Sequence, residues 1–287
     1  MARFFTISLY RFIYTDCIRD NHTGPVMIIT VFSPDEVSKR SILAANLAAH
    51  CALHYRKVLL IDATAPHHTL GWGACRDVTG IKSRLVVRGA ENLQSELEDP
   101  ASYSRSHYAE IVIDADGVNT QDTNAALVAT DVLLIPVHAR QGRVQNRQAL
   151  AQHIDALKLF NPELRVLVVE VQPISAFGEG ASTESSPARL VAASILTAKL
   201  ANTVIHEWID DRSTFQQGMS AMDSKLRNQR AVAEIQNLYQ EILKTRTQRL
   251  DPVANSQAIL QALQRRTEEK EICHISPDIA SNQASAM

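Results

Sequence analysis

Short apolar runs of strand length recur along the chain and alternate with segments whose apolar residues repeat every three or four positions. The first pattern is typical of buried β-strands, and the second of helices that pack on a sheet. Strands that alternate with helices form βαβ units, so the sequence predicts an α/β fold with a doubly wound, mainly parallel sheet flanked by helices. The predicted strands cover residues 26–32, 58–61, 111–113, 132–137 and 164–171, with a short one at 203–205.

Further helical patterns follow in the last third of the chain. Residues 188–201 are predicted as one apolar helix, and residues 231–243 show the spacing of a helix that packs on a sheet and closes the domain. Pro252 opens another candidate helix, which is followed by a charged run and a polar tail. We therefore expect an α/β domain over residues 26–247 and a C-terminal helix and polar tail over residues 248–287. The apolar stripe of that last helix consists of Val253, Ile259, Leu260 and Leu263.

The first 25 residues lack either periodicity, although several aromatic side chains lie there. We predict that residues 1–25 are a poorly ordered N-terminal extension. Met27 stands at the start of the first strand and is therefore an alternative to Met1 as the start of translation.

Composition narrows the function only slightly. A formal net charge of -2 excludes a globally basic nucleic-acid binder, but a local basic face remains possible because phosphate contacts need few Lys and Arg residues. The four cysteines lie far apart without metal-ligand spacing, so neither a disulfide framework nor a metal site is expected. No apolar run reaches the roughly 18 to 20 residues of a membrane span, and no cleavage pattern marks a secretion signal. We expect a cytoplasmic protein that does not bind membranes.

One loop carries most of the functional information. The first strand leads through Ser33-Pro-Asp-Glu-Val-Ser-Lys39-Arg40-Ser41 into a helix that continues toward Asn46-Leu-Ala. This segment resembles the first strand, deviant Walker A loop and first helix of ParA/MinD proteins, whose loop reads Lys-Gly-Gly-x-Gly-Lys-Thr-Thr. The resemblance extends over residues 26–243, because other family landmarks follow in the same order.

Those landmarks are two strands that end in acidic residues, followed by later segments of the chain. The segment 57–62, ending in Asp62, looks like the second strand of the family, and the segment 108–117 looks like its Walker B strand with Asp114 as the acidic residue. Residues 130–137, 161–169 and 212–218 also resemble family segments. The resemblance implies a P-loop fold of the ParA/MinD type and a role in plasmid partition or DNA segregation.

The loop nevertheless departs from the family at every critical position. If Lys39 takes the place of the Walker lysine, Asp35, Glu36 and Ser38 replace the three glycines, Pro34 replaces the signature lysine, and Arg40 replaces the hydroxyl that binds magnesium. Glycines let backbone N-H groups converge on an anion, and side chains there crowd that approach. Two carboxylates would also repel a polyphosphate. Thr64 further replaces the second acidic residue after the second strand.

These departures favour a degenerate Walker A motif with no ATP cofactor, or with weak ATP or ADP binding together with Mg. The residual nucleotide-binding candidates are Lys39, Arg40, Ser41, Asp62 and Asp114, and no catalytic residue is assigned. In an alternative register, Ser41 supplies the hydroxyl ligand. Asp62 and Asp114 have a structural interpretation too, since acidic residues at strand ends often cap neighbouring loops.

Two pairs of histidines are candidate ligand-binding residues. His50 and His54 have the spacing of a zinc pair on a helix but lack a third ligand, so an exposed or half-buried helix face is favoured. His67 and His68 follow the second strand, where active-site loops of this fold lie, and ordinary loop residues are the favoured interpretation.

The DNA-binding candidates lie in the C-terminal part, where ParA relatives place basic residues for sequence-independent contact. They are Lys199, Arg212, Lys225, Arg227 and Arg230, and a solvated helix entrance is the alternative interpretation. The resemblance suggests non-specific DNA and a ParB-like or DNA-transfer protein as partners. Because Pro34 cannot reach across an ATP-bound dimer as the signature lysine does, any homodimer should be independent of nucleotide.

The sequence therefore predicts a ParA-like plasmid partition or DNA-transfer accessory protein that acts as a pseudo-ATPase through DNA and protein contacts. One alternative is an active ParA-type ATPase that cycles on non-specific DNA. Another is a protein-interaction module that binds neither nucleotide nor DNA.

Overall fold

A computed structural model describes most of residues 26–247. The described ranges are 26–33, 38–53, 57–81, 83–91, 107–117, 121–139, 147–176, 186–207, 212–223 and 228–247, with the single positions 93, 97, 257, 260, 261 and 264. The predicted N-terminal extension and most of the predicted C-terminal helix and tail lie outside these residues, as do loop positions Pro34, Asp35 and Glu36.

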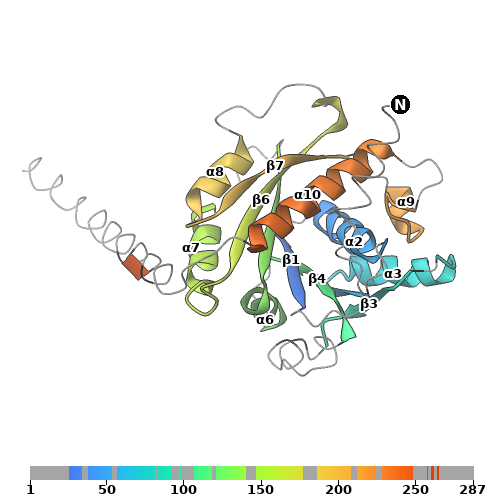
Figure 1. The fold of residues 1–287 in the computed structure, drawn as a ribbon, viewed down its shortest axis with the longest axis horizontal. Coiled ribbons are helices and arrows are strands. Elements are labelled where there is room, and N and C mark those ends of the chain that lie inside the picture. The colour runs from blue at the N-terminus through green and yellow to red at the C-terminus, as the bar shows by residue number, and fades with distance from the viewer. Residues whose placement is uncertain are drawn as a thin grey trace, which may run out of the picture.

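Seven strands form one parallel sheet in the order β3-β2-β4-β1-β5-β6-β7 (Figure 1). Most of the strand residues are apolar and buried, as expected for a parallel sheet covered on both faces. The predicted doubly wound α/β fold is confirmed. The strands are β1 (Met27–Ser33), β2 (Val58–Ala63), β3 (Leu85–Gly89), β4 (Glu110–Asp116), β5 (Val132–His138), β6 (Arg165–Gln172) and β7 (Lys199–His206).

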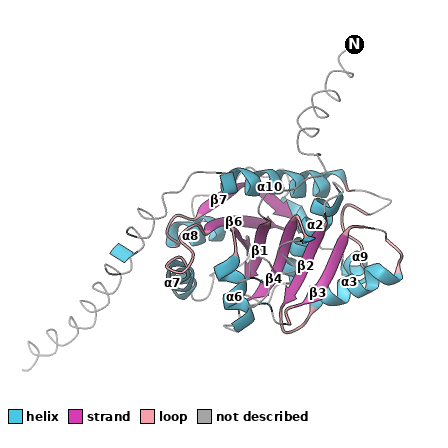
Figure 2. Ribbon diagram, turned by 60° about the horizontal axis from the view of Figure 1, so that its bottom comes forward, coloured by secondary structure: helices cyan, strands magenta, loops and turns pink. Residues whose placement is uncertain are grey.

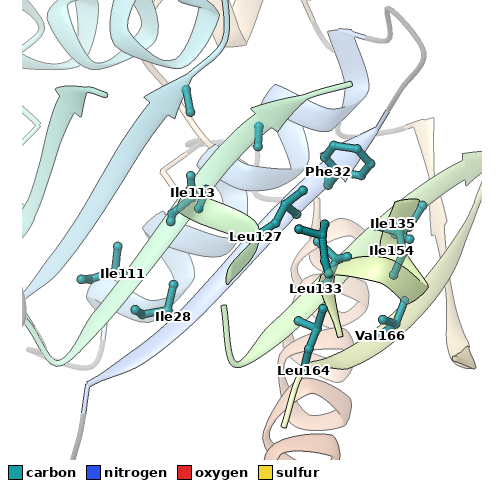
Figure 3. Packing of buried hydrophobic residues seen from close by; sticks show 14 of the residues in the cluster. Ile28, Phe32, Ile111, Ile113, Leu127, Leu133, Ile135, Ile154, Leu164 and Val166 are labelled. Atoms are coloured by element: carbon teal, nitrogen blue, oxygen red, sulfur yellow. The ribbon is translucent and has the colours of Figure 1, made fainter. Parts of the chain in front are cut away.

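Helices cover the two faces of the sheet in two groups (Figure 2). On one face lie α2 (Ser38–Leu53), α3 (His68–Val78) and α10 (Gln229–Thr247), and on the other lie α6 (Gln121–Ala129), α7 (Arg147–Leu157) and α8 (Pro187–Ser194). Figure 3 shows part of the second layer, where Leu127 and Ile154 pack with strand residues such as Leu133. Two short elements, η1 (Ile174–Ala176) and α9 (Arg212–Gln216), complete the described helices.

Helix α10 is fixed to the edge strand β7 by two glutamates. Glu241 accepts hydrogen bonds from the backbone N-H groups of Asn202 (2.8 Å) and Thr203 (2.7 Å), and Glu234 accepts one from the N-H of His206 (2.8 Å). Because the earlier glutamate meets the later strand residue, α10 runs antiparallel to β7. This helix contains the predicted segment 231–243 and confirms that prediction.

The sequence-based boundaries were wrong in two places. The helix predicted over residues 188–201 ends at Ser194, because Ile195 is extended and Thr197 takes a left-handed conformation (φ 61) that turns the chain into β7. Strand β7 thus begins at Lys199 rather than at residue 203. Strand β3 was not predicted at all; it pairs with β2 at the sheet edge and is only half-buried, so its apolar pattern is weak.

A buried lysine holds the turn between α8 and β7. The ammonium group of Lys158 donates hydrogen bonds to the carbonyl of Leu196 and the hydroxyl of Thr197, and it lies 3.9 Å from Asp155. Burial lowers the pKa of Lys158 to about 8, with Asp155 opposing the shift. The turn is therefore held by hydrogen bonds from Lys158, whereas burial disfavours the positive charge of this side chain.

Candidate functional site

Asp62 and Asp114 stand side by side at the carboxyl ends of β2 and β4. They are partners in the parallel register, and both are fully buried. Since side chains alternate along a strand, Asp114 shares the sheet face of Val112, which is the face covered by α2. The carboxyl edge of a parallel sheet is where ligands bind in doubly wound folds.

Arg40 reaches this edge from the first turn of α2. Its Nε donates a hydrogen bond to Asp114 Oδ1 at 2.7 Å, and its Nη1 donates one to the carbonyl of Ser33 at 3.3 Å. The side chains of Arg40 and Asp114 are 5% and 0% exposed. Burial raises the pKa of Asp114 above its ordinary value, and the charge of Arg40 offsets only part of that effect. Asp114 is therefore a buried acid whose partner is a fixed internal cation.

Lys39, beside Arg40, is paired inside the protein as well. Its ammonium group donates to Oε1 of Glu207, which directly follows β7, and the same oxygen lies 2.8 Å from Nε2 of His138 at the end of β5. The side chains of Lys39 and Glu207 are 19% and 23% exposed, so the pair is partly screened by solvent. The sequence did not identify Glu207 or His138, although His138 ends β5 and Glu207 follows β7 at the edge where the site was expected.

Asp62 organises the loop that follows β2. Its Oδ1 accepts hydrogen bonds from the backbone N-H (3.0 Å) and hydroxyl (2.7 Å) of Thr64, while its Oδ2 accepts one from the N-H of Leu70 (2.8 Å). Thr64 occupies the position at which the family resemblance would place a second acidic residue. Asp62 thus caps the loop after β2, which is the structural role that the sequence offered as an alternative to metal binding.

The space around Lys39 is small. A cavity of about 20 Å³ lies between α2 and the ends of β6 and β7, and Leu43 and Ile205 line it together with Lys39 and Glu207. This volume holds about one water molecule, whereas small-molecule sites typically measure about 300 to 1,000 Å³. This cavity by itself is too small to hold a nucleoside.

Of the five predicted DNA-binding residues, the structure describes the side chains of Lys199 and Arg230, and these two are not close together. Lys199 begins β7 at the amino end of the strand, while Arg230 lies in the first turn of α10, beside the carboxyl end of β7. The two exposed residues are thus at opposite ends of the same strand and helix pair. Lys225, Arg227 and the side chain of Arg212 lie outside the described residues.

The histidines and cysteines form no metal site in the part of the chain that the structure describes. His50 is buried, with its ring 5.2 Å from that of Tyr239, rather than on an exposed or half-buried face. His54 is not among the described residues. Neither Cys51 nor Cys75 forms a disulfide bond. Over the described ranges, no helix is both long enough and apolar enough to cross a membrane.

Solved structures with the same arrangement of strands and helices are MinD and plasmid partition proteins. The chain is similar to MinD from Pyrococcus horikoshii in complex with Mg-ADP, with a TM-score of 0.54 and 16% identity over 76% of this chain and 96% of that one. Its fold is that of the ParA/MinD P-loop proteins. No sequence family and no curated protein matches the chain by sequence.

Two further structures support this assignment of the fold. A plasmid partition protein from Borrelia burgdorferi bound to AMPPNP gives a TM-score of 0.52 and 19% identity over 76% of this chain and 99% of that one. MinD from the MinC:MinD complex of Aquifex aeolicus gives 0.51 and 17% over 79% and 99%. The predicted ParA/MinD-like fold is therefore confirmed.

A nucleotide with magnesium, as in the P. horikoshii complex, does not fit the charges of this site. The Ser41 hydroxyl and the Asp114 carboxylate are buried together and have the chemistry of metal ligands. However, the guanidinium of Arg40 already lies against Asp114. A divalent ion about 4 Å from that guanidinium would be repelled by roughly 8 kcal/mol at an effective dielectric constant of about 20.

Proposed function

We propose that the chain is a ParA-like plasmid partition or DNA-transfer accessory protein that works as a pseudo-ATPase, through DNA and protein contacts. The fold it shares with partition proteins supports the process. The buried pair between Arg40 and Asp114 is the observation that supports the loss of ATPase activity. In this proposal Arg40 provides the positive charge that a magnesium ion would otherwise bring to Asp114.

The pair between Lys39 and Glu207 supports the same proposal independently. A Walker lysine acts by donating hydrogen bonds to phosphate oxygens. Here a carboxylate of the protein accepts that hydrogen bond, and the adjoining cavity is too small for a nucleoside. Glu207 thus takes the part of the phosphate as the partner of Lys39.

Calorimetric titration with ATP and ADP, with and without magnesium, tests the proposal. We expect a dissociation constant weaker than about 10 μM, equivalent to roughly -7 kcal/mol, and no tightening by magnesium. Tighter binding that requires magnesium would contradict it. Hydrolysis of radiolabelled ATP above the level of a Lys39→Ala control would favour an active ParA-type ATPase instead.

Contact with DNA is a separate part of the proposal. Lys199 lies at the same end of the domain as the last turn of α10, which carries Lys244 and Arg246, so the basic charge there does not depend on the other predicted residues. Filter binding to random duplex DNA should give a slope of log affinity against log salt near -4 to -5 if all five predicted residues contact phosphates. Lys199→Glu should make the slope less steep by about 1.

The matched control for that variant is Arg147→Glu. Arg147 is exposed at the start of α7, which covers the other face of the sheet, so this variant makes the same change of charge away from the proposed surface. Equal losses of DNA affinity in the two variants would mean that only net charge matters. A chain that binds no DNA would be a protein-interaction module.

We further propose a cytoplasmic protein whose homodimer, where one forms, does not depend on nucleotide. Leu260 of the predicted terminal stripe is 48% exposed, which supports the stripe as an apolar contact surface. Sedimentation with and without ATP, on the whole chain and on a version ending at Thr247, tests this. Dimerisation driven by ATP would contradict the pseudo-ATPase proposal, and a dimer that survives truncation would exclude the terminal helix as its interface.

A further inference from the structure

A second and much larger cavity lies between α2, α3 and α9, which are neighbours in Figure 1. Its volume is about 600 Å³, within the usual range for small-molecule sites. Trp72 and Phe215 provide aromatic walls, Ile42 adds an aliphatic contact, and His67 and His68 lie at the start of α3. None of the residues that line it belongs to the pairs of Lys39 with Glu207 or Arg40 with Asp114, so this cavity is independent of the proposed pseudo-ATPase function.

The aromatic wall is held in place by contacts from outside the cavity. The indole Nε1 of Trp72 donates a hydrogen bond to the carbonyl of Met219 at 3.0 Å, and the ring stacks on Phe215 with 6.1 Å between centroids. The guanidinium of Arg76 also lies over the indole, 5.1 Å from the ring centroid. This guanidinium donates hydrogen bonds to both carboxylate oxygens of Asp223. A wall fixed in this way loses little conformational freedom when a ligand binds.

The polar groups of the cavity favour an acid over an amine. Among the described residues that line it, none is an Asp, Glu, Lys or Arg. The polar side chains are the imidazoles of His67 and His68, the thiol of Cys75 and the amide of Gln216. Imidazole N-H groups donate hydrogen bonds to a carboxylate, and the amino end of α3 adds the positive end of a helix dipole.

The backbone of His67 is also unusual. It precedes α3 in a left-handed conformation (φ 51, ψ 43) that residues other than glycine seldom adopt, and its Nδ1 lies 3.9 Å from the buried carboxylate of Asp62. Strained positions of this kind occur preferentially at ligand sites. We propose that this cavity binds a small aromatic carboxylic acid, with its ring against the half-buried Phe215, which Trp72 supports from behind, and its carboxylate at His67 and His68.

The rate at which a thiol reagent labels Cys75 can report ligand binding, because Cys75 lines the cavity and is partly exposed. Cys51 is buried. The two other cysteines, Cys17 and Cys273, are replaced by serine so that a thiol reagent labels Cys75. The probe is indole-3-acetate. Tryptamine presents the same ring with a positive charge, and cyclohexylacetate presents the same charge without an aromatic ring.

Gly71 offers a way to block the cavity without disturbing the fold. It lines the cavity, and a Cβ added there meets no atom within 4 Å, so Gly71→Leu should fill the space while α3 stays intact. Ala74→Leu is the matched control, since Ala74 is exposed on the same helix and does not line the cavity.

We expect saturating indole-3-acetate to slow the labelling of Cys75 at least fivefold in the parent chain and in Ala74→Leu, but not in Gly71→Leu. Tryptamine and cyclohexylacetate should each bind at least tenfold more weakly. The proposal is overturned if indole-3-acetate gives no protection, if Gly71→Leu is protected equally, or if either comparison compound binds as well. None of these outcomes depends on whether the protein binds ATP.

Discussion

Replacing Arg40 with methionine should destabilise the protein by about 4 kcal/mol at neutral pH. The guanidinium and the carboxylate of Asp114 are 2.7 Å apart, and their side chains are almost completely buried. Removing one partner of a buried ion pair typically costs roughly 3 to 5 kcal/mol, because the other charge is left without water or a counterion. Coulomb's law gives a similar figure, about 4 kcal/mol for charge centres 4 Å apart at an effective dielectric constant of 20.

The loss should depend on pH in a direction set by Asp114. Burial already raises the pKa of this carboxyl group above its ordinary 3.8, and removing Arg40 would raise it further. When the folded pKa is the higher one, the folded state binds a proton more readily than the unfolded state, so this stabilisation exists at low pH and is lost as the pH rises through the folded pKa. The difference between parent and Arg40→Met should therefore be small near pH 4 and grow by up to about 1.4 kcal/mol per pH unit.

Urea unfolding followed by circular dichroism, at about pH 4.5 and pH 7.5, measures both effects. A double-mutant cycle with Asp114→Asn separates the pair from other losses. The double variant should recover most of the stability that Arg40→Met loses, since it leaves no unpaired charge in the core. A loss below about 1 kcal/mol at both pH values, or a double variant no better than Arg40→Met, would refute the idea that Arg40 neutralises a buried acid.

Three further predictions concern other parts of the molecule. Burial lowers the pKa of Lys158 to about 8, so the folded state loses this proton at a lower pH than the unfolded state does. The free energy of unfolding should therefore rise by up to about 3 kcal/mol between pH 8 and 10.5 in the parent but not in Lys158→Met. If urea unfolding gives the two proteins the same dependence of stability on pH, this prediction is wrong. Gly218→Ala should lower the stability of the fold by more than about 3 kcal/mol, because the added Cβ would lie 2.2 Å from the backbone N of Arg76. Gly80 has a similar positive φ but open space around it, so Gly80→Ala should cost roughly 1 to 2 kcal/mol. Equal losses of stability in thermal melts would refute the steric reason. Glu207→Gln should tighten pyrophosphate binding at low salt about fivefold, roughly 1 kcal/mol, by removing the negative charge beside Lys39. Unchanged calorimetric affinity would show that this charge does not mask the lysine.

The sheet was predictable because its strands are buried on both faces. Runs such as that of β1 are apolar at nearly every position, and the alternation with helices fixes parallel connections. Helix α10 was predictable from its single apolar stripe. Strand β3 and the end of α8 were not, because β3 lies at a half-buried edge and the residues after Ser194 are apolar enough to suit either a helix or a strand.

Only those parts of the site that follow from the order of motifs along the chain were predictable. That order correctly placed Asp62 and Asp114 at strand ends and Arg40 at the start of a helix, and the structure adds that the two strands are neighbours. It could not pair Lys39 with Glu207, which lies 168 positions away. Nothing in the local sequence of Glu207 marks it as a partner, since the contact depends on where β7 ends relative to α2.

The two ion pairs have a joint consequence for regulation. A ligand shifts a conformational equilibrium only as far as it binds one state better than the other. In the proposed function, Arg40 provides the charge that a metal would bring to Asp114, and Glu207 provides the charge that a phosphate would bring to Lys39. Because side chains of the protein already provide both charges, ATP has little differential affinity to contribute in this proposal. Control over such a protein must therefore act at a different place, and among the described residues the cavity between Trp72, Phe215 and His67 is large enough for a ligand to do so.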